Sequence, residues 1–253
     1  MGLFGKSTFL ESDLEDWSLE TWAWLMRNLG GLERLRAAPL AVPSRDYFPP
    51  SETVEHERAV YLFELVKKHM GMDGWSCVLE ARDRPPANAQ VGEFWHVRSG
   101  SRPNGTFRID DGQPIVSYAA DLVAKPADLI ATFAHELSHY LIATIREPIP
   151  GGREIHELTT ELTVAFCGFG VFGANHAFSF SQHGDTFSQG WQSSRNGYFS
   201  ERSWAFALAL FSALTGREVS RQWLKPSVAD LTVKAGRYLD RNPKLLAPFR
   251  EAV

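Results

Sequence analysis

Cysteine is scarce in this chain of 253 residues, which contains only Cys77 and Cys167. Two cysteines cannot form the disulfide framework of a small secreted protein, and their separation matches no metal-binding motif. The first six residues also lack the apolar stretch of a secretory signal, and Lys6 stands where a myristoylation pattern requires Ser or Thr. We therefore expect a cytoplasmic protein.

The chain also has a small net charge and few long apolar runs. The formal net charge is −4, without a long run of like charges, which argues against a nucleic-acid partner and an acidic membrane surface. The longest uncharged segment, residues 162–182, is long enough to span a bilayer, but its three glycines, Asn175 and His176 dilute its apolar character. A buried core helix is the favoured interpretation, and no membrane partner is expected.

Hydrophobic residues make up 44% of the chain, enough for a sizeable core. Periodicity and capping residues predict helices at residues 13–28 and 51–70, with Ser51 as a cap. Further helices are predicted at 126–145, 153–172, 200–216 and 227–239. Ser200 and Ser227 are the expected caps of the last two helices.

Short β-favouring runs lie between the early and late helices, at residues 76–80, 92–97, 106–109 and 115–118. They predict a small, mostly antiparallel sheet and an α+β fold. We expect an N-terminal helical segment (1–70), a central core (71–182) and a C-terminal helical segment (183–253), together forming one compact domain.

The predicted helix at residues 126–145 carries His135-Glu136-Leu137-Ser138-His139. Histidines four positions apart emerge from one face of a helix and can share one metal ion. Zinc in such a site lowers the pKa of water to about 7, and a neighbouring carboxylate such as Glu136 can accept the proton. The spacing therefore predicts a zinc site with Glu136 as general base.

The alternative is that this pattern arose by chance on an ordinary helix. The flanking residues 129–134 and 140–142 are apolar almost all round, which predicts that the helix is buried. A buried helix does not ordinarily carry two histidines and a glutamate without a partner, since unpaired buried charge is unfavourable. This context favours metal binding.

Together with the second motif Glu157-Leu158-Thr159-Thr160-Glu161, the sequence resembles the gluzincin clan of zinc metallopeptidases, of which thermolysin is typical. The resemblance covers about thirty to forty residues. It implies a zincin-type pair of helices, zinc ligands at His135, His139 and Glu157, and a peptide or protein substrate. The clan usually has aspartate four positions after the third ligand, whereas this chain has Glu161, whose carboxylate we expect to support a ligand histidine.

Other sets of zinc ligands can be compared with the sequence. The metzincin pattern requires Gly at 142 and His at 145, and both positions are isoleucine. His156, His176 and His183 remain alternatives for the third ligand, although each is more often a structural histidine. His156 points about 100° away from Glu157 on the second helix and could replace it only if that helix were rotated.

Two further segments have competing interpretations. Residues 168–173 match the dinucleotide-binding glycine pattern, but they follow a helix and do not open one after a strand. Their glycines fit better as helix ends or close-packing positions. Residues 114–119 can form either an edge strand that binds an extended peptide or an ordinary internal strand.

The resemblance also implies a Tyr or His from a later segment that stabilises the negative oxygen formed during peptide hydrolysis. Tyr198 is our first candidate and His183 the second, although either residue taken alone is more often a surface residue. The sequence thus predicts a zinc-dependent hydrolase, most readily a peptidase. A zinc-containing protein that binds or regulates without catalysis is the alternative, and the intact Glu136 favours the enzyme.

Overall fold

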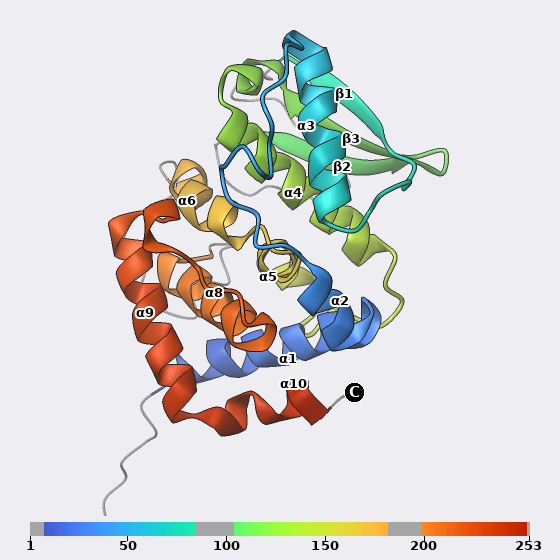
Figure 1. Ribbon diagram of the computed structural model, residues 1–253. Helices are drawn as coiled ribbons and strands as arrows, with labels where there is room; N and C mark the ends of the chain where they lie inside the picture. The colour runs from blue at the N-terminus through green and yellow to red at the C-terminus, as the bar shows by residue number, and fades with distance from the viewer. Residues whose placement is uncertain (1–7, 84–103, 182–198, 252–253) are drawn as a thin grey trace, which may run out of the picture.

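The computed structural model describes residues 8–83, 104–181 and 199–251, which form a mostly helical molecule with a small sheet on one side, next to α3 and α4 (Figure 1). The helices are α1 (Ser12–Asn28), α2 (Gly31–Ala37), α3 (Glu55–His69), α4 (Pro126–Ala143), α5 (His156–Phe166), α6 (Gly170–Ser181), α8 (Glu201–Thr215), α9 (Pro226–Arg241) and α10 (Ala247–Glu251). The strands are β1 (Val78–Arg82), β2 (Gly105–Asp110) and β3 (Gln113–Ala119). The α+β class is confirmed, with much more helix than strand.

The three strands form a mixed sheet in the order β1-β3-β2. β1 runs parallel to β3, while β2 and β3 form an antiparallel hairpin. Asp111 and Gly112, both with positive φ, make the two-residue turn of this hairpin. The predicted sheet was therefore only half right, because β1 pairs with β3 and leaves its sequence neighbour β2 at the other edge. The predicted strand at 92–97 lies outside the described residues.

β3 is the central strand, so of the two interpretations of residues 114–119 the internal strand is right and the edge strand is not. The physical reason is its apolar character: Ile115, Val116 and Tyr118 are buried, whereas β1 and β2 are more exposed. The ring of Tyr118 packs edge-on against Phe133 of α4, with ring centroids 5.6 Å apart. The sheet is thereby fixed against the helix that carries the histidine motif.

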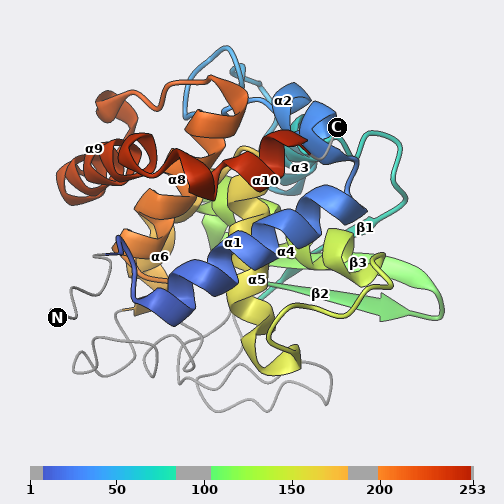
Figure 2. The same ribbon diagram turned by 90° about the horizontal axis from the view of Figure 1, so that it is seen from below.

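Helix α5 occupies the centre of the molecule, in contact with α1, α4, α6 and α8 (Figure 2). Trp22 of α1 packs edge-on against Phe166 of α5, with ring centroids 5.8 Å apart. One hydrophobic core extends from Phe9 to Phe249, so helices from both ends of the chain belong to the core that surrounds α5. Full burial of a large apolar side chain in such a core stabilises the fold by about 1.5–3 kcal/mol.

The helix boundaries partly follow the predicted capping signals. Ser200 caps α8 by accepting a hydrogen bond from the Ser203 amide at 3.1 Å, and the helix ends at Gly216 in the left-handed conformation. In contrast, Ser51 lies before α3, which begins at Glu55. Ser227 lies inside the first turn of α9, because Pro226 already begins that helix.

Residues 153–172 form two helices and a short turn where one helix was predicted. A 3₁₀ turn at Arg153–Ile155 leads into α5, which ends before Gly168, a residue with φ of +86°. A Cβ at Gly168 would lie 1.7 Å from the Pro39 carbonyl oxygen, and a Cβ at Gly173 would lie 2.1 Å from Trp204. These glycines therefore end α5 and let α6 pack closely on α8. No helix in the described residues has the length and apolar composition needed to cross a membrane.

Candidate metal centre

Helix α4 carries the histidine motif and begins with Pro126, whose missing amide hydrogen is not needed in the first turn. The helix packs against α3, α5, α6 and the sheet, which explains its apolar composition on nearly every face. His135 and His139 lie one turn apart, and their side chains are 13% and 12% exposed. The motif is therefore on a mostly buried helix, as predicted.

Helix α5 brings Glu157 to these two histidines. Its Oε2 lies 3.3 Å from Nε2 of His135 and 3.8 Å from Nε2 of His139, and the two Nε2 atoms are 3.1 Å apart. The turn between α4 and α5 is held by the Trp17 indole, which donates to the Pro150 carbonyl at 3.0 Å. Two segments separated along the sequence thus present three ligand atoms to one point.

This arrangement fits a zinc ion in both chemistry and spacing. Two imidazole nitrogens and one carboxylate oxygen form a ligand set that zinc accepts, and the three residues could hold one metal ion. Ligand atoms at about 2.0–2.1 Å from a tetrahedral zinc would be about 3.3–3.4 Å apart. The observed separations of 3.1 to 3.8 Å bracket that value.

Two of the three candidate ligands have the protonation state that metal binding requires. Burial lowers the pKa of His139 to about 3, so its imidazole is neutral at pH 7. Burial acts to raise the pKa of Glu157, but the neighbouring His135, His139 and His156 outweigh it and lower that pKa to about 2. An ionised Glu157 beside a neutral His139 is ready to bind a cation.

His135 and Glu136 have pKa values shifted by their buried surroundings. Burial acts to lower the pKa of His135, but the carboxylates of Glu161, Glu157 and Glu136 together raise it well above the usual value. Burial raises the pKa of Glu136 to about 7, against the opposing positive charge of His135 and Arg82. A carboxyl group with this pKa can both accept and release a proton near neutral pH.

Three side chains of α5 lie around His135 and His139. Oε1 of Glu161 lies 3.5 Å from Nδ1 of His135, the placement expected of a supporting carboxylate. The Thr160 hydroxyl oxygen lies 3.2 Å from Nδ1 of His139, and the ring of His156 stacks parallel to that of His139 with centroids 4.9 Å apart. Sequence reasoning missed Thr160, although its position one turn after Glu157 on the same helix face indicated it.

The sheet contacts the general-base candidate through Gly105, the first residue of β2. A Cβ at this position would lie 3.0 Å from both Cγ and Oε1 of Glu136 and 2.6 Å from Cγ2 of Thr132. The next residue, Thr106, accepts a hydrogen bond from the Arg82 guanidinium. An edge of the sheet therefore lies directly against the Glu136 side chain.

Of the three alternative third ligands, His156 lies beside the site, His176 lies elsewhere and His183 lies outside the described residues. His156 is buried beside His139, but the group of three ligand atoms contains Glu157. Nδ1 of His176 pairs with Asp128 at 2.7 Å, which joins α6 to the first turn of α4. His183 and Tyr198 lie outside the described residues, so the prediction of Tyr198 as a catalytic residue is not addressed by the structure.

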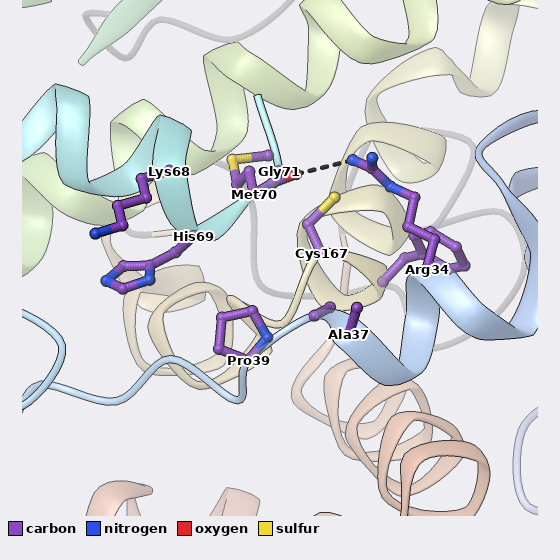
Figure 3. A pocket seen from close by; sticks show the side chains of 10 residues that line it. Arg34, Ala37, Pro39, Lys68, His69, Met70, Gly71 and Cys167 are labelled. Atoms are coloured by element: carbon purple, nitrogen blue, oxygen red, sulfur yellow. Dashed lines mark hydrogen bonds between the residues drawn. The ribbon is translucent and has the colours of Figure 1, made fainter. Parts of the chain in front are cut away.

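A separate hollow of about 390 Å³ lies where α2, the end of α3 and the end of α5 meet (Figure 3). None of the 10 residues that line it carries a carboxylate. Arg34 donates to the Met70 carbonyl at 2.8 Å and thereby satisfies an acceptor at the end of α3. Burial raises the pKa of the Cys167 thiol to about 11, so it remains protonated. This hollow does not have the composition of a metal site.

Comparison with known proteins gives no match: no family model, no curated protein and no solved structure matches the chain. The functional conclusion therefore depends on the residues of the candidate metal centre alone.

Proposed function

We propose that this chain is a zinc-dependent hydrolase, and specifically a peptidase, with α4 and α5 as a zincin-type pair of helices. The observation that carries the proposal is the convergence of His135, His139 and Glu157, whose ligand atoms lie within 4.8 Å of one another. Glu136, which follows the first ligand directly, is buried beside them. The resemblance to gluzincins assigns the same role of metal ligand to His135, His139 and Glu157.

In this proposal the metal ligands are His135, His139 and Glu157, and Glu161 supports His135. When bound, zinc would polarise a carbonyl group and lower the pKa of water, so that hydroxide is available as the nucleophile near neutral pH. Glu136 accepts the proton of that water, holds it in the buried site and passes it to the leaving nitrogen. The pKa of about 7 suits this exchange in both directions.

A peptide substrate is supported by the position of β2. Within the described residues β2 pairs only with β3, and its first residue contacts Glu136. An extended peptide can add to a strand edge through main-chain hydrogen bonds, which places a scissile bond at a site beside that edge. In this proposal β2, and not residues 114–119, is the edge strand that binds an extended peptide.

The test combines metal analysis with hydrolysis of a peptide library, read by mass spectrometry. The parent protein should hold about one zinc per chain, and a chelator should abolish cleavage. Glu136→Gln should keep the zinc and lose about 10²–10⁴ in turnover, because it removes the group that transfers the proton. Glu154→Gln, an identical change at an exposed glutamate, serves as the control and should leave both properties unchanged.

Two results would contradict the proposal. Full activity in Glu136→Gln would remove this residue as the general base. Zinc binding by the parent without cleavage of any peptide in the library would favour the noncatalytic zinc protein.

The ligand assignment is tested by zinc titration of Glu157→Ala, Glu161→Ala and His156→Ala. Loss of Glu157 should weaken binding most, because it removes a direct ligand, while loss of Glu161 should weaken it by about ten- to a hundredfold. If Glu157→Ala bound zinc as tightly as the parent while His156→Ala did not, the third ligand would be His156.

A further inference from the structure

Thr160 lies on α5 at the edges of two stacked histidine rings and is fully buried. Its hydroxyl oxygen has three polar neighbours: Nδ1 of His139 at 3.2 Å, the carbonyl oxygen of His156 at 3.0 Å and Nδ1 of His156 at 3.5 Å. A hydroxyl group has one hydrogen to donate and two lone pairs that accept. Its three possible interactions therefore match its three neighbours in number.

The direction of these hydrogen bonds follows from the carbonyl. A carbonyl oxygen can only accept, so the Thr160 hydroxyl donates its single hydrogen to the His156 carbonyl. The Thr160 oxygen is then an acceptor toward His139. A short contact between this acceptor and Nδ1 of His139 requires that Nδ1 carry the hydrogen.

The hydrogen on Nδ1 decides what the other ring nitrogen can do. Since a neutral imidazole carries one hydrogen, Nε2 of His139 then presents a lone pair. Nε2 is the atom that faces Nε2 of His135 at 3.1 Å and Oε2 of Glu157 at 3.8 Å. A metal ligand must present a lone pair at that atom.

We propose that Thr160 is a positioning residue that fixes His139 in the Nδ1–H tautomer and aims Nε2 at the metal ligands His135 and Glu157. This inference rests on the metal site of the proposed function. Thr160 would do for His139 what the Glu161 carboxylate does for His135, with a neutral hydroxyl in place of a charge.

The stacked ring of His156 restricts His139 from a second direction. The two rings are nearly parallel, with an interplanar angle of 4° and centroids 4.9 Å apart. Thr160 contacts the edge of the His139 ring, and His156 covers one face. The His139 ring therefore cannot rotate without breaking one of these two contacts.

The test uses Thr160→Val, which keeps the branched shape and removes the hydroxyl, and Thr160→Ser, which keeps the hydroxyl. Thr163→Val is the matched control, because Thr163 is also buried on α5 and its hydroxyl donates one turn back, to the Thr159 carbonyl at 2.8 Å. In the described part of the chain no hydrogen bond joins Thr163 to a histidine. Zinc affinity is measured by competition with a chromophoric chelator, and histidine tautomers are identified in the metal-free proteins by ¹⁵N NMR of the rings.

We expect Thr160→Val to bind zinc about 10- to 100-fold more weakly than the parent and to lose the Nδ1–H preference of His139. Thr160→Ser and Thr163→Val should both stay close to the parent. Parent-like zinc affinity in Thr160→Val, a loss in Thr160→Ser as large as that in Thr160→Val, or an Nε2–H tautomer of His139 in the parent would overturn the assignment. A parent that binds no zinc would overturn the metal site itself, and the tautomer measurement would then decide the role of Thr160 independently.

Discussion

Gly105 offers a direct test of how the sheet packs against α4, the helix that carries the histidine motif. As part of β2 its backbone is in a conformation that any residue adopts, so Gly105→Ala introduces a packing problem and no backbone strain. The new methyl group would lie 2.6 Å from Cγ2 of Thr132 and 3.0 Å from Cγ and Oε1 of Glu136. Both Thr132 and Glu136 are buried, so neither side chain can move freely out of the way.

The expected effect is a loss of stability by overpacking. Adding a methyl group to a filled core typically destabilises a protein by about 1–3 kcal/mol. For a chain of this size each kcal/mol lowers the melting temperature by about 2–4 °C. Gly105→Ala should also lower turnover, because a displacement of the general base by about 1 Å can reduce the rate by about a hundredfold. Zinc content should not change, since the close contacts do not include a metal ligand.

Thr132→Ser provides the matched second change. It removes the closest atom, Cγ2, and keeps the hydroxyl that donates to the Asp128 carbonyl at 2.9 Å. By itself this small deletion should destabilise by about 0.5–1.5 kcal/mol. In the double variant the added methyl fills the space of the deleted one, so the double variant should be more stable than the sum of the single effects by at least about 0.5 kcal/mol.

Denaturant unfolding of the four proteins measures this coupling, and peptide hydrolysis measures turnover in the same samples. Strictly additive stabilities would refute the contact between β2 and α4. A double variant that regained both stability and full turnover would show that the remaining 3.0 Å contact with Glu136 has no effect on proton transfer.

Two further predictions concern zinc affinity and the end of α5. Because His135 has a raised pKa and must lose its proton to bind metal, zinc affinity should fall by about tenfold for each unit of decreasing pH below that pKa. Calorimetric titration of Glu136→Gln removes the titration of Glu136 itself, while Glu161 and Glu157 still raise the pKa of His135. An affinity independent of pH between 5 and 8 would contradict the prediction. Gly168→Ala should destabilise the fold by more than about 1 kcal/mol, because alanine is strained at φ of +86° and its methyl would overlap the Pro39 carbonyl. Thermal unfolding at parent level would contradict the prediction.

Local signals in the sequence were enough to predict much of the helical fold. The Ser200 cap and the Gly216 stop of α8 were right because each depends on a few neighbouring residues. The spacing of His135 and His139 predicted their common helix face for the same reason. The choice of Glu157 as the third candidate ligand was implied by the gluzincin resemblance, and in the structure Glu157 lies close enough to the two histidines to share a metal ion with them.

The features that the sequence did not predict depend on contacts between distant segments. The predicted helix at 153–172 ran past the end of α5 because the apolar pattern continues through Gly168, although the glycines at 168–173 had indicated a helix end. The central position of β3 depends on which strand is most buried in the finished sheet. Thr160 gains its importance only when α5 lies beside α4, since its partner His139 is 21 positions away in sequence.

Because α5 is central, the sheet, α4 and α5 are not expected to fold as a fragment without the terminal helices. The helix that carries Glu157, Thr160 and Glu161 is enclosed by α1 from one end of the chain and α8 from the other. A fragment containing only the sheet, α4 and α5 would expose apolar faces of α5 to water and would lack Trp22 against Phe166. The candidate metal centre is therefore not a transferable module, because the terminal helices hold α5 in place.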